Sequence, residues 1–114
     1  MTRLFRWLRK RLFGTQELGI SKVRYVETHT AIRRLIEDDC MVVVGTPLYP
    51  KWGVFMCPCR RGHRIELNLQ RHLEPHWQLS VRGSRPTVQP SVDHQGAYRC
   101  HFRLIDGLVR WVED

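Results

Sequence analysis

Thiol and imidazole side chains gather in two short segments of the chain, residues 57–63 and residues 100–101. The first reads CPCRRGH and the second reads CH. Thiolates and imidazoles are the ligands that zinc prefers, usually four of them in a tetrahedron. We therefore expect a zinc site formed where the fold brings the two segments together. Our candidate ligands are Cys57, Cys59, Cys100 and His101.

The spacing inside each segment leaves the ligand set open. A zinc knuckle usually has two residues between its cysteines, whereas only Pro58 separates Cys57 from Cys59. Adjacent residues point to opposite faces of a regular strand, so either Cys100 or His101 could face the core instead of the metal. His63 is accordingly a fourth ligand, a proton shuttle or a partly buried histidine on an apolar face.

Hydrolysis by the metal would need a proton acceptor near it. Three protein ligands leave zinc a bound water whose pKa falls toward about 7, and a nearby side chain must take its proton. Our candidate catalytic residues are Glu66, Ser91 and His63. Glu66 lies on the opposite face of a predicted strand from His63, which is typical of a solvated residue. Ser91 follows a proline in a predicted turn, where it is a hydrogen-bond donor to substrate or a turn residue, and no Gly-x-Ser-x-Gly motif marks it as a nucleophile.

The four cysteines favour a reducing compartment over a disulfide framework. Cys57 and Cys59 are too close in sequence to bond each other easily, and the N-terminus lacks the apolar core of a secretory signal. Cys40 begins an apolar run and is expected to be a buried free thiol. No apolar run approaches the ~20 residues of a membrane-spanning helix. We expect a cytoplasmic protein.

The positive charge is concentrated at one end of the chain. The 114 residues carry 19 Lys and Arg against 11 Asp and Glu, a net charge of +8, and residues 1–14 hold five of the basic residues and no acid. Their apolar side chains fall on one side of a helix, which predicts a basic amphipathic helix. Such a helix contacts an acidic partner, a membrane surface or nucleic acid, or packs on its own domain. Nucleic acid is not favoured, because the remaining chain shows no basic stripe.

The rest of the chain reads as short strands separated by turns. We expect residues 1–19 to form the basic helix and a linker, and residues 20–114 to form a zinc-binding, β-rich domain. The fold class is α+β, a small and mostly antiparallel sheet built around the zinc site, with the N-terminal basic amphipathic helix in front of it. The predicted strands are 21–27, 40–44, 52–56, 63–69, 77–81, 87–92, 102–105 and 108–112, with a short helix at 31–37. Asp106 and Gly107 predict a tight hairpin between the last two strands.

Several motifs of residues 56–112 form a familiar combination. They read MCPCRRGHRIELNL, HWQLS, TVQPSV and YRCHFRLIDGLVRWV. Together they resemble a family of small bacterial zinc-binding, peptidase-like domains. The positions that match its pattern are Cys57, Cys59, Gly62, Pro90, Ser91, His101, Gly107, Val109 and Trp111. Two positions depart from it: Arg61 stands where the family has a third cysteine, and Tyr98 where it has the cysteine three residues before the histidine, while Cys100 lies beside His101.

The resemblance implies a function in bacterial ubiquitin-like conjugation operons, in a pathway of antiviral defence. The implied partners are a ubiquitin-like protein and its activating/conjugating enzyme fusion. The implied activity is that of a Zn2+-dependent peptidase, a hydrolase that processes or removes the ubiquitin-like modifier. The alternative is a non-catalytic structural zinc module that mediates protein or nucleic-acid interaction. The two differ in coordination, because an open position with a water favours catalysis and four protein ligands favour a structural site.

Overall fold

The computed structural model describes residues 19–113. The basic amphipathic helix predicted at residues 1–14 lies outside the described residues. No helix in the described part of the chain is long and apolar enough to cross a membrane.

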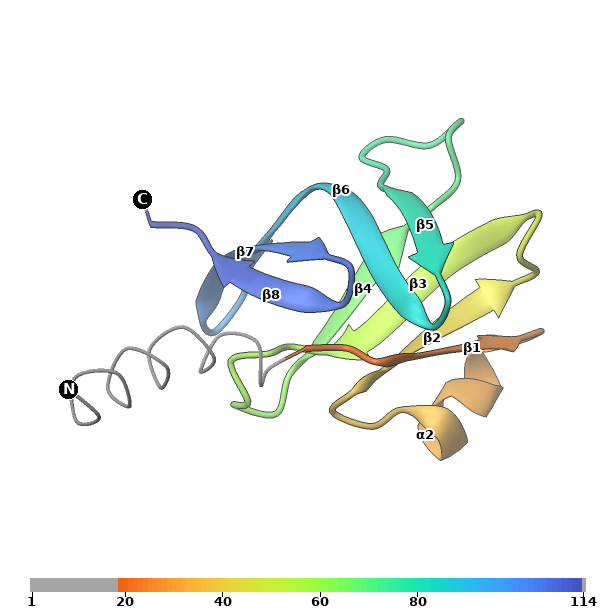
Figure 1. The fold of residues 1–114 in the computed structure, drawn as a ribbon, viewed down its shortest axis with the longest axis horizontal. Coiled ribbons are helices and arrows are strands. Elements are labelled where there is room, and N and C mark those ends of the chain that lie inside the picture. The colour runs from red at the N-terminus through yellow and green to blue at the C-terminus, as the bar shows by residue number, and fades with distance from the viewer. Residues whose placement is uncertain (1–18, 114) are drawn as a thin grey trace, which may run out of the picture.

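Two four-stranded sheets make up the described chain (Figure 1). The first has the order β1-β2-β3-β4, in which β1 and β2 run parallel and the other neighbours antiparallel. The second has the order β5-β6-β7-β8 and is antiparallel throughout. The elements are β1 (Lys22–Val26), the 3-10 turn η1 (His29–Ala31), α2 (Ile32–Leu35), β2 (Cys40–Gly45), β3 (Pro50–Met56), β4 (Arg64–Asn68), β5 (Gln78–Arg82), β6 (Arg85–Gln95), β7 (Arg99–Ile105) and β8 (Leu108–Trp111). The prediction of a mostly antiparallel sheet with little helix is confirmed for residues 19–113.

The main hydrophobic core lies between the two sheets. Phe55 of β3 and Phe102 of β7 meet edge to face, with ring centroids 6.2 Å apart, and both are fully buried. Aromatic pairs prefer this geometry, and the burial of both rings adds to the hydrophobic stabilisation of the contact between the sheets. The two sheets therefore pack as one unit, which fixes the β3–β4 turn relative to β7.

A smaller core covers the other face of the first sheet. Met41 and Val43 of β2 face the main core, while Cys40, Val42 and Val44 face the smaller core beneath α2. A strand buried on both faces is apolar at every position instead of alternating, which explains the continuous run in β2. Cys40 is thus a buried thiol whose pKa is raised by burial, as we expected of a structural cysteine.

The tight turn between β7 and β8 also anchors the start of the described chain. Asp106 and Gly107 both have positive φ, 50° and 77°, as a two-residue hairpin turn requires. The carbonyl of Gly107 accepts a hydrogen bond from the backbone N–H of Ile20, which is buried. A glycine at position 107 therefore allows both the backbone conformation of the turn and the close approach of residue 20.

We expect Gly107→Ala to lower the free energy of unfolding by about 3 kcal/mol, because the conformation is costly for an L side chain and a Cβ would collide with the carbonyl of Ile20. Gly83 is a matched control: its φ is 65°, but a Cβ there has nothing within 4 Å. Gly83→Ala should cost about 1 kcal/mol, the conformational part alone. Urea unfolding followed by tryptophan fluorescence measures both values, and equal losses would contradict the close-approach argument.

Candidate active site and metal centre

Three cysteines and one histidine meet at one end of the main core. The ligand atoms of Cys57, Cys59, His63 and Cys100 all lie within 4.8 Å of one another. His63 Nε2 is 3.0 Å from Cys59 Sγ and 3.6 Å from Cys100 Sγ. The three predicted cysteine ligands are thus brought together, and the imidazole beside them belongs to His63, the alternative fourth ligand. His101 lies outside this group.

The turn between β3 and β4 lets both Cys57 and Cys59 face the cluster although only one residue separates them. The N–H of Cys57 donates to the carbonyl of His63 at 2.9 Å, and the N–H of Arg60 donates to the carbonyl of Cys57 at 3.1 Å. Arg60 and Gly62 have positive φ, 60° and 87°, which curls the chain tightly. The curl turns the side chains of residues 57, 59 and 63 toward a common point, and β7 adds Cys100 from the second sheet.

The electrostatics of the group fit a cation. Burial raises the pKa of the Cys57 thiol to about 12 and raises that of Cys100, so both are neutral thiols at pH 7 without a positive partner. Burial lowers the pKa of His63, with further lowering by His94 and Arg61, so its imidazole is the neutral form that binds metals. A bound divalent cation would stabilise the thiolate forms and so lower the pKa of these cysteines. Three thiols and one imidazole therefore could hold a metal ion, and such a set is one that zinc prefers.

Aromatic side chains cover the histidine of the cluster. The ring of His94 stacks on that of His63 with centroids 4.7 Å apart. The centroid of the Tyr98 ring lies 6.1 Å from that of His63. The guanidinium of Arg61 sits 4.5 Å from the centre of the Tyr98 ring. The two positions at which the sequence departs from the family pattern thus pack on each other beside the cluster, as a cation–π pair.

A second polar pair lies on the neighbouring strands β6 and β7. Ser91 Oγ is 3.0 Å from His101 Nε2, and both residues are half-buried. A hydroxyl in hydrogen-bond contact with an imidazole is the arrangement that activates a serine nucleophile. His101, a predicted metal ligand, is placed with Ser91, a predicted catalytic residue, and not with the thiols.

A bulge in β6 lies at this contact. Val88 pairs with Leu104 and Val92 pairs with Phe102, so β6 advances four residues while β7 advances two. Pro90 lies in the bulge, where its missing N–H breaks no ladder hydrogen bond. Bulges re-aim side chains and are frequent beside active sites. Ser91 lies within this bulge, and its hydroxyl contacts His101.

The neighbours of the pair hold it in position. The indole Nε1 of Trp77 donates a hydrogen bond to the carbonyl of Ser91 at 3.2 Å. Asp93 lies directly opposite His101 in the β6–β7 register. Its carboxylate accepts two hydrogen bonds from Arg99, at 3.2 and 3.1 Å, and these hold the pKa of Asp93 below its usual value. A negative charge therefore persists beside His101 at neutral pH.

A shallow hollow of about 340 Å³ opens beside Ser91. Its lining includes Gln89, Pro90, Arg103 and Ile105. Arg103 follows His101 by two positions and therefore shares the face of β7 that carries it. The hollow offers room for a substrate chain against the Ser91 hydroxyl, with one cationic side chain in its wall.

Glu66 belongs to neither group. It is exposed on β4, where its carboxylate forms an ion pair with Arg64 at 3.2 Å. Within residues 19–113, no hydrogen bond or ion pair joins it to Ser91, His101 or the cysteines. The pairing of Ser91 with His101 is the feature that we missed from the sequence. A predicted hairpin between residues 85–95 and 99–105 would have placed Ser91 and His101 on adjacent strands. Their register could not be predicted, because β6 has a bulge at Pro90.

A family model matches residues 26–112 of the chain. Its description is bacterial ubiquitination-like system serine protease (BubE). No curated protein and no solved structure matches the chain. The description agrees with the ubiquitin-like operons that the resemblance implied, and it names a serine protease where we expected a zinc peptidase. Both the thiol cluster and the Ser91–His101 pair fall inside the matched residues, and the chain belongs to the BubE family.

Proposed function

We propose that this protein is a serine peptidase that processes or removes a ubiquitin-like modifier, with Ser91 as nucleophile and His101 as general base. The observation that carries this proposal is the 3.0 Å contact between Ser91 Oγ and His101 Nε2. The BubE match supports the reaction class and the pathway. The hollow beside Ser91 supports access of a peptide chain to the hydroxyl.

The chemistry is acyl transfer through Ser91. Nε2 of His101 takes the hydroxyl proton as Ser91 Oγ bonds to the carbonyl carbon of the scissile group. The bond from that carbon to the leaving nitrogen or oxygen then breaks, and His101 passes the proton to the leaving group. Water next bonds to the acyl carbon as it gives a proton to His101, the bond from that carbon to Ser91 Oγ breaks, and His101 returns the proton to Oγ. The modifier leaves with a free carboxyl end. Asp93 stabilises the imidazolium that forms in each half of the cycle, because its negative charge lies opposite His101.

We further propose that the cluster of Cys57, Cys59, His63 and Cys100 binds zinc in a structural role. Four protein donors match the full coordination number of a structural zinc site, so none remains for the water of a metallohydrolase. When bound, the ion supplies a cross-link between the β3–β4 turn and β7. Cys100 directly precedes His101, so this link holds the strand that carries the general base.

The proposed partners are the ubiquitin-like protein of the system and its activating/conjugating enzyme fusion. They rest on the resemblance described above, with the BubE match as support for the pathway. We also propose a cytoplasmic location, because the four cysteines favour a reducing compartment. The basic segment 1–14 is proposed to contact an acidic partner or a membrane surface, because it holds five positive charges and no acid.

Ser91→Ala should abolish cleavage of the ubiquitin-like protein carrying a C-terminal peptide extension, with a loss of at least about 10⁴-fold in kcat/KM, because it removes the nucleophile. His101→Gln should lose about 10³-fold, because the hydroxyl proton then has no acceptor. Mass spectrometry of the released extension measures both. Ser80 on β5 is the control, since it is an exposed serine outside the site, and Ser80→Ala should retain full activity.

Labelling with a fluorophosphonate gives an independent readout of the same pair. The unmodified protein should gain one adduct at Ser91, and His101→Gln should label far more slowly. Cleavage that survives in Ser91→Ala would refute the assignment. A protein that neither cleaves the fusion nor labels would instead be the non-catalytic binding module.

Metal analysis of the purified protein should find one zinc ion per chain, and Cys57→Ser should lower both the zinc content and the melting temperature. Ser91→Ala should keep the full zinc content, because Ser91 lies outside the cluster. Cys40→Ser is the matched cysteine control and should also keep the zinc. If zinc removal leaves the fold and the labelling of Ser91 intact yet abolishes cleavage, the metal is catalytic and the structural assignment is wrong.

A further inference from the structure

A second hollow is lined by residues that the proposed chemistry does not use. Its volume is about 510 Å³, and it runs between the β2–β3 turn and the loop from β4 to β5. Leu48 and Tyr49 form part of its rim and are 84% and 76% exposed, more than any other large apolar side chain in the described chain. We call this hollow the turn groove.

The first wall of the turn groove is a rigid turn. The N–H of Tyr49 donates to Thr46 Oγ1 at 3.0 Å, and the N–H of Thr46 donates to the carbonyl of Tyr49 at 3.3 Å. Gly45 enters the turn with φ of 123°, at a place where a Cβ would meet the carbonyl of Tyr49 at 2.5 Å. Pro47 and Pro50 restrict the backbone on either side of the exposed pair. Leu48 and Tyr49 are thus held in solvent by the turn and do not fold back onto the core.

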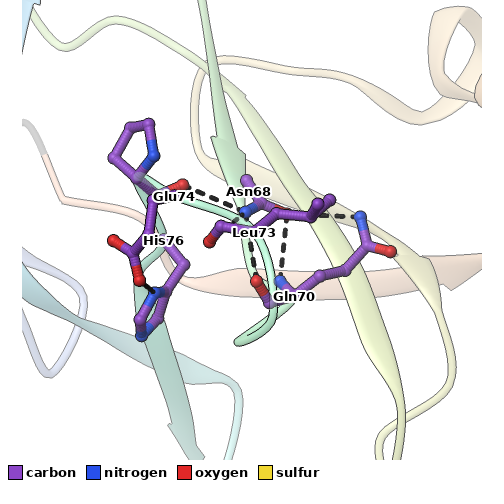
Figure 2. Close-up of polar contacts among 6 residues, drawn as sticks. Asn68, Gln70, Leu73, Glu74 and His76 are labelled. Carbon is purple, nitrogen blue, oxygen red and sulfur yellow. Dashed lines mark hydrogen bonds and ion pairs between the residues drawn. The ribbon is translucent and has the colours of Figure 1, made fainter.

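The second wall is a loop fastened by one buried amide. Asn68 is 7% exposed, and its Nδ2 donates to the carbonyls of Gln70, Leu73 and Pro75 at 3.2, 3.3 and 3.0 Å. Its Oδ1 accepts hydrogen bonds from the backbone and side-chain nitrogens of Gln70. Figure 2 shows Asn68 with the loop folded around it, and His76 bonded to Glu74 at the far end. Both walls are therefore preorganised, so a ligand would not have to order them.

The turn groove is connected to the active site through Trp77. This side chain lines the groove, and its indole Nε1 donates to the carbonyl of Ser91. On β5, Gln78 lines the groove and pairs with Gln89, which lines the hollow beside Ser91. The groove and the hollow beside Ser91 therefore border the paired strands β5 and β6, respectively.

The charge of the lining selects the occupant. Lys51 and Arg71 line the groove, and no acidic residue among residues 19–113 does so. Residues 1–14 of the same chain hold five positive charges and no acid, so like charge disfavours this segment as the occupant. A ligand with an apolar side chain flanked by carboxylates complements this lining. Its apolar group would contact Leu48 and Tyr49, and its carboxylates would pair with the two cations.

We propose that the turn groove is the docking site for the folded part of the ubiquitin-like substrate, which presents an apolar patch flanked by acidic residues. This rests on the proposed function, because it takes the substrate to be the protein that Ser91 cleaves. The groove binds the body of the substrate, and the chain that leaves it reaches the hollow beside Ser91. Specificity for the modifier then comes from the groove, and bond cleavage comes from Ser91 and His101.

Binding is tested in the Ser91→Ala variant, which holds the substrate without turnover. The probe is the ubiquitin-like protein of the same system with a short C-terminal extension, and calorimetry measures Kd. Leu48→Ala combined with Tyr49→Ala should weaken binding about tenfold or more, because exposed aromatic and apolar anchors dominate such contacts. Tyr25 on β1 is the matched control, since it is a 37% exposed tyrosine on the far edge of the first sheet. Tyr25→Ala should leave Kd unchanged.

A second variant tests the charge argument separately. Lys51→Glu combined with Arg71→Glu should weaken binding by a similar factor at low salt, and added salt should reduce the difference. Both residues are exposed, so these changes leave the core intact. An unchanged Kd in both double variants overturns the groove as the docking site, and a failure of the Ser91→Ala protein to bind the probe overturns the choice of partner.

Fluorophosphonate labelling separates this proposal from the catalytic one. The small probe reacts with Ser91 alone, so both groove variants should label at the rate of the unmodified protein while KM for the fusion rises. Slower labelling of the groove variants would show that the groove acts on the catalytic pair and would overturn docking as its role. Loss of labelling in the unmodified protein would instead contradict the role of Ser91, and the binding result would still decide the groove.

Discussion

The meeting of β7 with the β3–β4 turn is the contact on which the rest of the structure depends. Cys100 Sγ lies 3.6 Å from His63 Nε2, so the second sheet touches the turn of the first at the thiol cluster. Phe55 and Phe102 repeat this contact two residues further along β7. Because both contacts involve β7, the strand cannot slide relative to the first sheet. A domain with so few buried residues gains more from such a tie than a larger one would.

Because side chains alternate along β7, its contact with the first sheet positions both the thiol cluster and the Ser91–His101 pair. Cys100 and Phe102 face the core, so His101 and Arg103 face the opposite side, toward Ser91 and its hollow. A shift of β7 by one residue would exchange the two faces and destroy the cluster and the Ser91–His101 pair together. The register that buries the thiols is therefore also the register that places His101 beside Ser91.

Much of the fold could be predicted from the sequence, because its elements are marked by strong local signals. The alternation of residues 63–69, the continuous apolar run of β2 and the Asp106–Gly107 turn each identified a strand or hairpin that the structure contains. The parallel pairing of β1 with β2 and the division into two sheets could not be predicted, because they depend on contacts between distant segments. Asn68 shows the same limit. Its position in the alternation indicates a solvated residue, yet it is buried because the loop after β4 supplies partners for its amide.

The candidate site shows why residue types are easier to predict than their grouping. Cys57, Cys59 and Cys100 were expected together and lie together, whereas His63 and His101 exchange the places that we first gave them. Cys100 and His101 are neighbours in sequence, but alternation sends them to opposite faces of β7, so adjacent ligand types belong to separate sites. Ser91 lies in the irregular part of β6, where the register shifts between Val88 and Val92, and a bulge leaves no periodic signal in a sequence. The cluster of four possible metal donors does not include His101, and the imidazole of His101 contacts Ser91 instead.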